Sequence, residues 1–309
     1  MKKISVVIPM YNEEEVAQVC YVRLTQVMRQ ISNYDYELIF INDGSKDKTL
    51  EIMKEIALKD NRIKILSFSR NFGHQSAVLC GLNYAGGDAV IIIDADLQDP
   101  PEVIPDMIKH WEEGFEVVYG KRKSRKGESA FKLLTASMFY RFINSLSNVE
   151  LPKDTGDFRL VDRKVVDVIV NMPERNKYLR GLVSWIGFNQ YPYEYDREKR
   201  YAGKTKYPLR KMMKLAGDGI ISFSNKPLKM VGGFGIFAII ISIVVLIYSI
   251  VSLIVGNNVQ PGWTSIMVAI TFFAGTQLLC LWVIAEYISR IYDNSKARPE
   301  YIVDERINF

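Results

Sequence analysis

Short apolar runs alternate with amphipathic stretches along roughly the first 120 residues of the chain. The apolar runs have the length and β-branching of buried strands, and they lie at residues 4–9, 36–41, 63–68, 89–93 and 115–119. Between them, apolar residues recur at helical spacing at residues 16–31, 49–58, 75–84 and 103–112. This regular alternation predicts an α/β fold with a doubly wound, mostly parallel sheet.

Three of the predicted strands end in polar residues, and these read Met10-Tyr11-Asn12-Glu13, Asn42-Asp43-Gly44-Ser45 and Asp94-Ala95-Asp96-Leu97-Gln98. Ligands of an open α/β sheet bind outside the carboxyl ends of its strands, so the three segments predict one site. Asp94, Asp96 and Gln98 offer hard oxygen ligands, which suit Mg²⁺ or Mn²⁺ carrying the phosphates of a nucleotide. Taken alone, a carboxylate pair at this spacing is more often a solvated turn, and the neighbouring motifs reverse that preference.

The chain loses its charge towards the C-terminus. No Asp, Glu, Lys or Arg occurs from Met230 to Ala285. This stretch contains two hydrophobic segments, at residues 231–255 and 263–285. Each would be about 35 Å long as a helix, which suffices to cross a bilayer core of about 30 Å. Neither segment has a polar face, which disfavours a pair of buried core helices.

Basic residues flank the two predicted spans. Lys226 and Lys229 precede the first span, and Arg290, Lys296 and Arg298 follow the second. By the positive-inside rule, the globular part and both termini are cytoplasmic and the protein resides in the cell membrane. The predicted division is a globular domain at residues 1–225, a membrane part at 226–290 and a cytoplasmic tail at 291–309.

Two further segments, at residues 129–147 and 207–223, are amphipathic and carry basic residues. Both fit helices lying in the membrane interface, although a helix packed on the core fits the first segment equally well. Lys and Arg also cluster at 121–126, 197–214 and 226–229 within a net charge of +5. Such clusters serve phosphates, anionic lipid or nucleic acid. Nucleic acid is disfavoured because few aromatic residues are interleaved with them.

Missing motifs disfavour several other functional classes. No GxGxxG follows the first predicted strand, and Gly203-Lys204-Thr205 is not a P-loop ending because position 198 is Glu instead of Gly. The three cysteines have no CxxC spacing and form no familiar zinc site with the two histidines. We interpret them as free thiols in a reducing compartment.

In their joint order, the motifs resemble those of GT-A glycosyltransferases of family 2. The resemblance is carried by Val6-Val7-Ile8-Pro9-Met10-Tyr11-Asn12-Glu13-Glu14, Asn42-Asp43-Gly44-Ser45 and Asp94-Ala95-Asp96-Leu97-Gln98-Asp99-Pro100. It is narrowed by Arg70-Asn71-Phe72-Gly73-His74-Gln75, Thr155-Gly156-Asp157-Phe158-Arg159-Leu160 and Lys204-Thr205-Lys206-Tyr207. With the two spans, the whole chain resembles polyprenyl-phosphate glycosyltransferases, which are relatives of dolichyl-phosphate mannose synthase, and especially the bactoprenol glucosyltransferases. This resemblance implies a GT-A fold, a Rossmann-like sheet.

The resemblance implies a nucleotide-sugar site at the strand ends. Pro9 and Tyr11 would form a wall for the base, and Glu13 and Asp43 would accept hydrogen bonds from the base or ribose. Metal ligands would be Asp94, Asp96 and Gln98, holding Mg²⁺ or Mn²⁺ against the donor diphosphate. The full set implied for the nucleotide sugar is Pro9, Tyr11, Glu13, Ile41, Asp43, Asp94, Ala95, Asp96 and Gln98.

The resemblance also implies an inverting displacement in which Asp157 is the catalytic carboxylate. Asp157 would either remove a proton from the acceptor or only orient it, because a phosphate monoester with a second pKa of about 6 is already largely an anion. Phosphate binding would fall to Arg122, Arg200 and Lys206. His74 lies in a Gly-His-Gln context before a predicted helix, and we interpret it as a capping or loop-packing residue.

The implied reaction moves a sugar, glucose from UDP-glucose above others, to undecaprenyl phosphate in the membrane. The product would be a polyprenyl-phosphate sugar for modification of cell-envelope glycans, and a homo-oligomer is compatible with this activity. Two alternatives stay open. One is a membrane-anchored nucleotide-sugar-binding scaffold or sensor without turnover. The other is a polysaccharide synthase-like transferase, which is disfavoured because no QxxRW-type segment follows Asp157.

Overall fold

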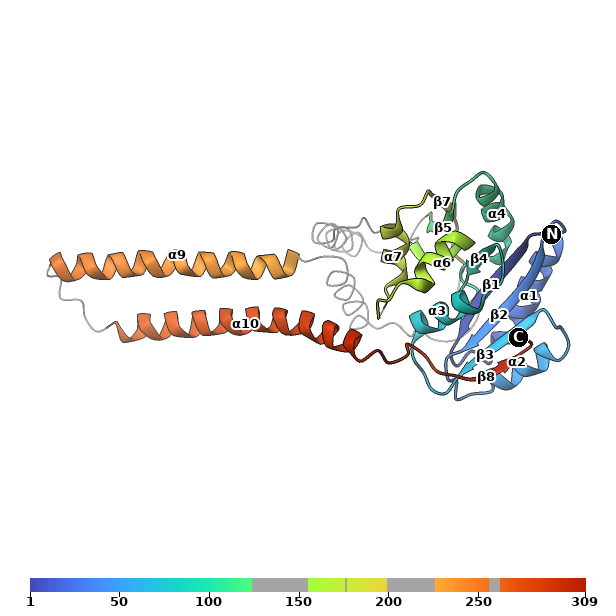
Figure 1. The fold of residues 1–309 in the computed structure, drawn as a ribbon, viewed down its shortest axis with the longest axis horizontal. Coiled ribbons are helices and arrows are strands. Elements are labelled where there is room, and N and C mark those ends of the chain that lie inside the picture. The colour runs from blue at the N-terminus through green and yellow to red at the C-terminus, as the bar shows by residue number, and fades with distance from the viewer. Residues whose placement is uncertain (124–154, 176, 199–225, 256–261) are drawn as a thin grey trace. The chain divides into compact units, whose positions relative to one another are not determined.

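The computed structural model describes residues 1–123, 155–175, 177–198, 226–255 and 262–309. These residues belong to two compact units. The first unit contains a sheet with its helices and includes Arg298–Phe309, and the second contains the two long helices of the C-terminal third (Figure 1). The amphipathic segments expected at 129–147 and 207–223 lie outside the described residues, as do Arg200 and Lys206.

An eight-stranded sheet forms the centre of the first unit. Its strands, in spatial order, are β7 (Gln190–Tyr195), β5 (Val117–Arg122), β6 (Thr155–Asp162), β4 (Ala89–Ile92), β1 (Lys3–Met10), β2 (Asp35–Asn42), β3 (Ile63–Phe68) and β8 (Val303–Ile307). Strands β4, β1, β2 and β3 pair in parallel, and so do β5 and β7. Strand β6 runs antiparallel to β4 and β5, and β8 runs antiparallel to β3. The sheet is mixed but mostly parallel, as expected for a GT-A-like α/β fold.

Helices pack on both faces of this sheet (Figure 1). One face carries α1 (Ala17–Gln30), α2 (Thr49–Ala57), the short 3₁₀ turn η1 (Pro101–Val103) and α4 (Ile104–Glu112). The other face carries α3 (His74–Tyr84), α6 (Arg163–Asn171) and α7 (Leu179–Ile186). In β1, Ile4, Val6 and Ile8 are buried on the first face and Val7 on the second. Because side chains alternate across a strand, a strand covered on both faces is mostly apolar along its length.

The elements predicted between residues 4 and 112 are all present, and no end is shifted by more than one residue. The strand predicted at 115–119 is found further along, as β5. Strands β6, β7 and β8 and helices α6 and α7 were not predicted. Strand β8 has no apolar run in the sequence because it contains Asp304-Glu305-Arg306. Its residues are alternately exposed and half-buried at the edge of the sheet. Local apolar pattern therefore identifies the strands from β1 to β5, whereas it misses the edge strands β7 and β8 and also the internal strand β6, whose buried sequence includes Gly156, Asp157 and Arg159.

The C-terminal residues fasten β8 to the sheet. The ring of Tyr301 stacks on that of Phe68 with centroids 5.3 Å apart. Asn308 Nδ2 donates hydrogen bonds to the carbonyl oxygens of Ala57 and Ile63 at 3.1 and 2.8 Å. Part of the segment expected to be a cytoplasmic tail is thus a strand of the sheet.

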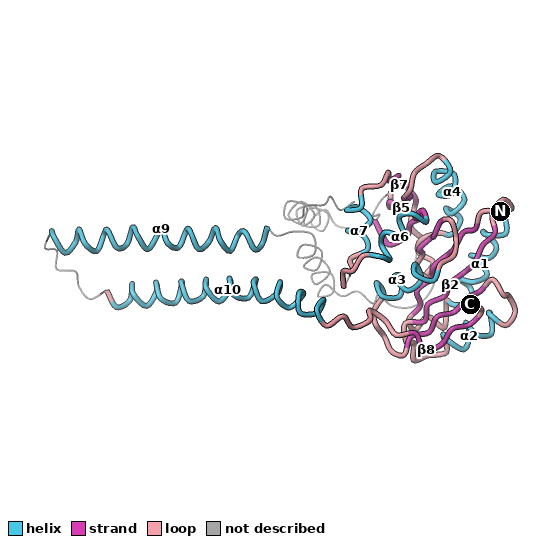
Figure 2. The backbone as a smooth tube through the Cα atoms, in the orientation of Figure 1, coloured by secondary structure: helices cyan, strands magenta, loops and turns pink. Residues whose placement is uncertain are grey.

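The second unit contains α9 (Lys226–Val255) and α10 (Trp263–Ser295), which are 30 and 33 residues long (Figure 2). Within the described residues, one stretch, Phe272–Ser295 of α10, is long and apolar enough to cross a membrane. Helix α9 contributes a shorter apolar stretch, Leu228–Ala238. The expectation of two membrane spans therefore stays a prediction.

Candidate active site

The three polar segments expected to form one site follow neighbouring strands. Strands β4, β1 and β2 are adjacent and parallel, so their carboxyl ends and the loops that follow lie at the same edge of the sheet. Pro9 and Ile41 are buried in β1 and β2, and Tyr11 and Glu13 are half-buried in the loop after β1. The structure thus brings the residues that were predicted to bind a nucleotide to one edge of the sheet. Their role in binding stays a prediction.

The buried carboxylate of Asp43 holds the loop that leads into α3. Its Oδ1 accepts a hydrogen bond from the backbone N of Phe72 at 2.7 Å, and its Oδ2 accepts one from Asn71 Nδ2 at 2.9 Å. Gly44 beside it has a φ of +67°, and a Cβ there would lie 2.4 Å from the backbone carbonyl carbon of Arg70. Asp43 therefore stabilises the loop that leads into α3, independently of any contact it makes with a nucleotide.

The loop after β4 carries Asp94, Asp96 and Gln98. The backbone N of Gln98 donates to Asp96 Oδ1 at 3.1 Å, and Leu97 between them has a left-handed φ of 56°. This conformation costs a non-glycine residue of order 1 kcal/mol, and the buried side chain of Leu97 helps to hold it. The strain coincides with the segment in which the sequence predicts metal ligands.

Negative charge is concentrated around Asp94. Burial raises the pKa of this carboxyl to about 6; His74 opposes the increase, whereas the charges of Asp157, Asp99 and Asp96 add to it. A divalent cation would relieve this repulsion, and Mg²⁺ is usually held by one or two carboxylates together with substrate phosphates. Among the residues that the structure describes, no three His, Cys, Asp or Glu side chains form a metal site by themselves. A cation here would be coordinated partly by these side chains and partly by the phosphates of a bound nucleotide.

Asp157 lies across from Asp94. The antiparallel pairing of β4 with β6 ends with Ile92 opposite Arg159. Asp94 follows the end of β4 and Asp157 precedes Arg159 on β6, and His74 lies close to both carboxylates. The guanidinium of Arg180, near the start of α7, donates from Nε to Asp157 Oδ1 at 2.7 Å and from Nη2 to Oδ2 at 3.0 Å. Burial alone would raise the pKa of Asp157, but Arg180 and His74 hold it well below its usual range.

His74 bridges the two facing carboxylates. Its Nε2 lies 3.1 Å from Asp157 Oδ2 and 3.6 Å from Asp94 Oδ1. Burial disfavours the charged imidazole, yet Asp94 and Asp157 raise its pKa to about 9. His74 begins α3, and the helix has no side-chain cap. The interpretation of His74 as a capping residue was therefore wrong, and its side chain packs between the two carboxylates of the candidate site.

Arg122, predicted to bind phosphate, lies beside the same group. A Cβ on Gly156 would meet Arg122 Nη2 at 2.8 Å, so the guanidinium is packed against the residue that precedes Asp157. Arg122 Nη2 is 3.8 Å from Oδ1 of the buried Asp99. Asp99 Oδ2 and Arg122 Nε are both buried without a hydrogen-bond partner in the described part of the chain. Unmatched polar atoms of this kind fit a site that receives a charged ligand.

Comparison with known proteins decides the family. The model of the family described as "Glycosyl transferase family 2" matches residues 5–170, which include β1 to β6 and the carboxylates just described. The chain belongs to glycosyl transferase family 2.

Full-length relatives agree with this assignment. A glycosyltransferase of Bacillus subtilis named as uncharacterized, YkcC, is 51% identical over 97% of this chain and 93% of its own. A glycosyltransferase of Synechocystis, also named as uncharacterized, is 45% identical over 98% of this chain and 95% of its own. The bactoprenol glucosyl transferase of Shigella phage SfV is 42% identical over 97% of this chain and 98% of its own.

Solved structures of other glycosyltransferases resemble part of the chain. Glucosyl-3-phosphoglycerate synthase from Mycobacterium tuberculosis, solved in complex with Mn²⁺, UDP-glucose and phosphoglyceric acid, has a TM-score of 0.45 and 21% identity. The match covers 71% of this glycosyltransferase and 78% of that chain.

Sequence reasoning missed Arg180 altogether. Its partner Asp157 is 23 residues away, and His74 is 83 residues from Asp157. No local motif links these three positions. Only chemistry could have indicated a residue such as Arg180, because a buried carboxylate on β6 requires positively charged partners.

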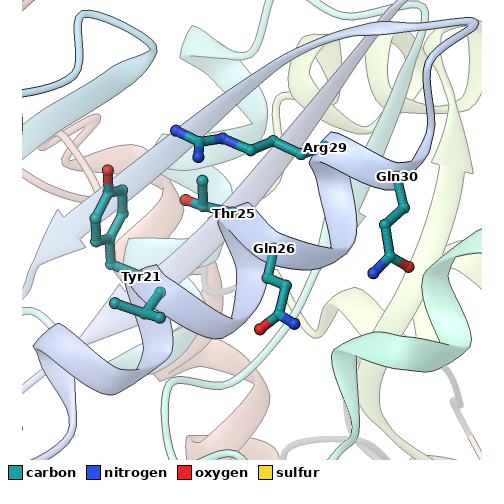
Figure 3. A pocket seen from close by; sticks show the side chains of 6 residues that line it. Tyr21, Thr25, Gln26, Arg29 and Gln30 are labelled. Carbon is teal, nitrogen blue, oxygen red and sulfur yellow. The ribbon is translucent and has the colours of Figure 1, made fainter.

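A separate groove of about 430 Å³ lies on α1 of this glycosyltransferase (Figure 3). It is lined by Tyr21, Val22, Thr25, Gln26, Arg29 and Gln30. None of the predicted site residues lines the groove, and it is not part of the candidate active site.

Proposed function

We propose that this glycosyltransferase moves glucose from UDP-glucose to a membrane polyprenyl phosphate, with inversion at the anomeric carbon. The observation that carries the proposal is the pair of facing carboxylates at the carboxyl edge of the sheet, Asp94 and the Arg180-bound Asp157. The full-length likeness to the bactoprenol glucosyl transferase of phage SfV supports the choice of a lipid phosphate as acceptor and of glucose as the sugar.

The donor would bind across the ends of β1, β2 and β4. Pro9 and Tyr11 would contact the base, and Glu13 the base or the ribose. Ile41 and Ala95 would line the nucleotide pocket. Asp43 would approach the nucleotide while it also holds the loop before α3, because each carboxylate oxygen can accept more than one hydrogen bond.

Asp94, Asp96 and Gln98 would hold Mg²⁺ or Mn²⁺. When bound, such an ion supplies charge neutralisation for the leaving diphosphate. The raised pKa of Asp94 supports this assignment, because a carboxylate repelled by its neighbours gains most from a cation.

In the transfer, a phosphate oxygen of the acceptor would form the new bond to the anomeric carbon while the bond to the nucleoside diphosphate breaks on the opposite face. The acceptor phosphate has a second pKa of about 6 and is already largely a dianion at neutral pH. Asp157 is held by Arg180 and has a pKa below its usual range, which makes it a poor proton acceptor. We therefore assign Asp157 an orienting role and not that of a general base.

Two phosphorylated partners must approach each other, which requires positive charge. Arg122 would supply it next to Gly156, and Arg200 and Lys206 would add to it from the segment at 199–225. His74 would offset the charge of both facing carboxylates, because its pKa of about 9 keeps the imidazole protonated at neutral pH.

The acceptor's location requires a membrane-bound enzyme. We propose that α9 and α10 both span the membrane, with the sheet unit and both termini in the cytoplasm. The apolar stretch of α10 and its exposed Leu278 and Trp282 support this arrangement, as do the basic residues that flank the two helices.

The direct test uses the full chain purified in detergent and a panel of radiolabelled nucleotide sugars with undecaprenyl phosphate. We expect lipid-extractable label from UDP-glucose in the presence of Mg²⁺ or Mn²⁺, and none after Asp94→Asn. Absence of label with every donor, in protein that still binds a nucleotide sugar, would contradict transfer and favour a binding scaffold.

A further inference from the structure

The first residues of β8 lie at the same edge of the sheet as the candidate active site. Strand β8 runs antiparallel to β3, and its first residue, Val303, pairs with Phe68, the last residue of β3. The contact continues beyond the two strands, because the backbone N of Ser69 donates to the carbonyl oxygen of Ile302 at 3.2 Å. The segment that follows α10 therefore reaches the sheet beside the loop at 69–73, which joins β3 to α3.

Tyr301 contacts both elements that this loop joins. Its ring stacks on that of Phe68 with centroids 5.3 Å apart and an angle of 10° between the planes. Its hydroxyl accepts a hydrogen bond from Nδ2 of Asn83 on α3 at 3.1 Å. Burial raises the pKa of that hydroxyl, and Cys80, one turn earlier on α3, adds to the increase. A single side chain therefore joins the strand before the loop to the helix after it, and we name this arrangement the Tyr301 bridge.

The bridged loop holds two side chains of the candidate site. The ring of Phe72 packs edge-on against that of Phe68 with centroids 5.7 Å apart. The backbone N of Phe72 donates to Asp43 Oδ1 at 2.7 Å, and that of Gly73 donates to Oδ2 at 3.0 Å. The next residue is His74, whose side chain packs between the two carboxylates of the site. The position of the loop therefore sets the positions of Asp43 and His74.

Few side chains of the loop are packed against the rest of the protein. Ser69, Arg70 and Asn71 are exposed. Gly73 has a φ of +100°, and no atom lies within 4 Å of the position that a Cβ would take. Exposed backbone with few packed neighbours opens at a low cost in free energy, so the order of this loop depends on how firmly its two ends are held. The Tyr301 bridge holds both of them.

We propose that Tyr301 is a positioning residue for the candidate site, and that it acts by fixing β3 and α3 to each other across the loop at 69–73. The inference rests on the proposed function, which gives Asp43 and His74 their roles in the transfer. Loss of the ring releases the loop, and with it these two side chains, while the backbone pairing of β3 with β8 keeps the sheet folded. The segment after α10 is thus part of the scaffold of the active site.

The test uses the full chain purified in detergent and compares Tyr301→Ala and Tyr301→Phe with Tyr34→Ala. Phenylalanine keeps the ring stacking and loses the hydrogen bond to α3. Tyr34 is a matched control because it is also half-buried, its ring centroid lies 6.0 Å from that of Trp111, and its hydroxyl donates to Glu112. It comes directly before β2 and so lies at the opposite edge of the sheet.

Hydrogen exchange tests the bridge without turnover. In Tyr301→Ala, the amides of Phe72 and Gly73 should exchange about 10-fold faster than in the wild type, and in Tyr301→Phe about 3-fold faster. The amide of Leu38, which donates to the carbonyl oxygen of Arg62, should change much less, because the sheet stays folded. Tyr34→Ala should leave the amides of Phe72 and Gly73 unchanged. Equal acceleration at all three amides in Tyr301→Ala, or none at the loop, would overturn the proposal.

Two functional readouts follow from the release of Asp43 and His74. With UDP and Mg²⁺ as the probe, the Kd of Tyr301→Ala should rise about 3-fold or more, because binding must then order the loop. The rate of transfer from UDP-glucose should fall about 5-fold or more as the side chains lose their positions. Tyr301→Phe should lie between Tyr301→Ala and the wild type in both readouts, and Tyr34→Ala should match the wild type. A Tyr301→Phe enzyme equal to the wild type would exclude a bridge to α3.

Failure of the bridge and failure of the proposed function give different results. If the wild type transfers no sugar to the lipid phosphate, the proposed function fails, while the amides of Phe72 and Gly73 still report whether Tyr301 holds the loop. If the wild type transfers sugar and Tyr301→Ala binds UDP and transfers sugar equally well, the positioning role fails and the proposed function stands.

Discussion

The two halves of the sheet unit position their candidate site residues in different ways. In the first half, from β1 to α4, the site residues Asp43, Asp94 and Asp96 come directly after the strands that position them. In the second half, from β5 to β7, the site depends on contacts between distant segments, since Asp157 takes its partners from α7 and α3. Residues on the predicted donor side are therefore positioned by the local sequence, and those on the predicted acceptor side are positioned by tertiary packing.

The two facing carboxylates show the same contrast in their electrostatics. Burial raises the pKa of Asp94 to about 6 with the help of other carboxylates, whereas Arg180 and His74 depress that of Asp157 against the effect of burial. Groups whose surroundings separate their pKa values usually have separate chemical roles. Asp94 is suited to a cation that arrives with the substrate, and Asp157 already has its cation in the protein.

The largest expected effect comes from removing the carboxylate of the first half. Asp94→Asn should lower turnover by about 10²-fold or more, because it removes an electrostatic contact to the reacting groups. Its melting temperature should be equal to or higher than that of the wild type, since burial disfavours the charge that is lost. Steady-state transfer and thermal melting measure the two quantities. Asp167→Asn, an exposed change on α6, is the control, and full activity of Asp94→Asn would remove Asp94 from the site.

The corresponding change in the second half should affect folding as well as turnover. Arg180→Met leaves Asp157 with His74 alone, and removing one partner of a buried ion pair costs about 3 kcal/mol or more of stability. Turnover should fall about 10-fold as Asp157 loses its orientation. Denaturant unfolding of the full chain gives the first value.

The double variant Asp157→Asn/Arg180→Met checks the cause of that loss. It should be more stable than Arg180→Met alone, because the buried carboxylate that has lost its arginine partner is removed as well. Equal stability of the two would mean that Arg180 acts through packing and not through its ion pair.

A substitution at Gly44 tests whether the first half of the sheet unit depends on a close backbone contact. Gly44→Ala should cost about 2 kcal/mol or more, because alanine is strained at positive φ and its Cβ would lie 2.4 Å from the carbonyl carbon of Arg70. Gly114→Ala is the matched control, since Gly114 has a φ of +102° with no atom within 4 Å of the added Cβ. If both variants lose the same stability, the close approach at Gly44 does not matter.

The smallest expected effect lies beside Asp157. The added methyl of Gly156→Ala would meet Arg122 Nη2 at 2.8 Å, and the end of a flexible side chain can move aside. Stability should change by less than about 1 kcal/mol, while turnover falls about 3-fold to 10-fold as the guanidinium is displaced. In an Arg122→Ala background the same change should have no further effect; an additive loss would show that Gly156 matters for another reason.

The sequence predicts the first half of the sheet almost residue by residue because its strands are buried on both faces and mostly apolar, with few exceptions such as Ser5 and Glu37. It does not predict β7 or β8, whose half-exposed residues mix polar and apolar side chains at the sheet edges. The same division holds for the site. Asp94 and Asp96 are readable from their position after a strand, whereas the roles of Arg180 and His74 depend on contacts across 23 and 83 residues.

The central claim is that the acceptor is a lipid-borne phosphate that needs orientation more than deprotonation. The most direct measurement offers labelled UDP-glucose and Mg²⁺ to the full-length enzyme with undecaprenyl phosphate, undecaprenol or a water-soluble phosphate monoester in parallel. We expect glucose to be transferred to undecaprenyl phosphate alone. Transfer to undecaprenol would contradict the claim, because an alcohol acceptor needs a general base, and preference for the soluble monoester would exclude the membrane acceptor.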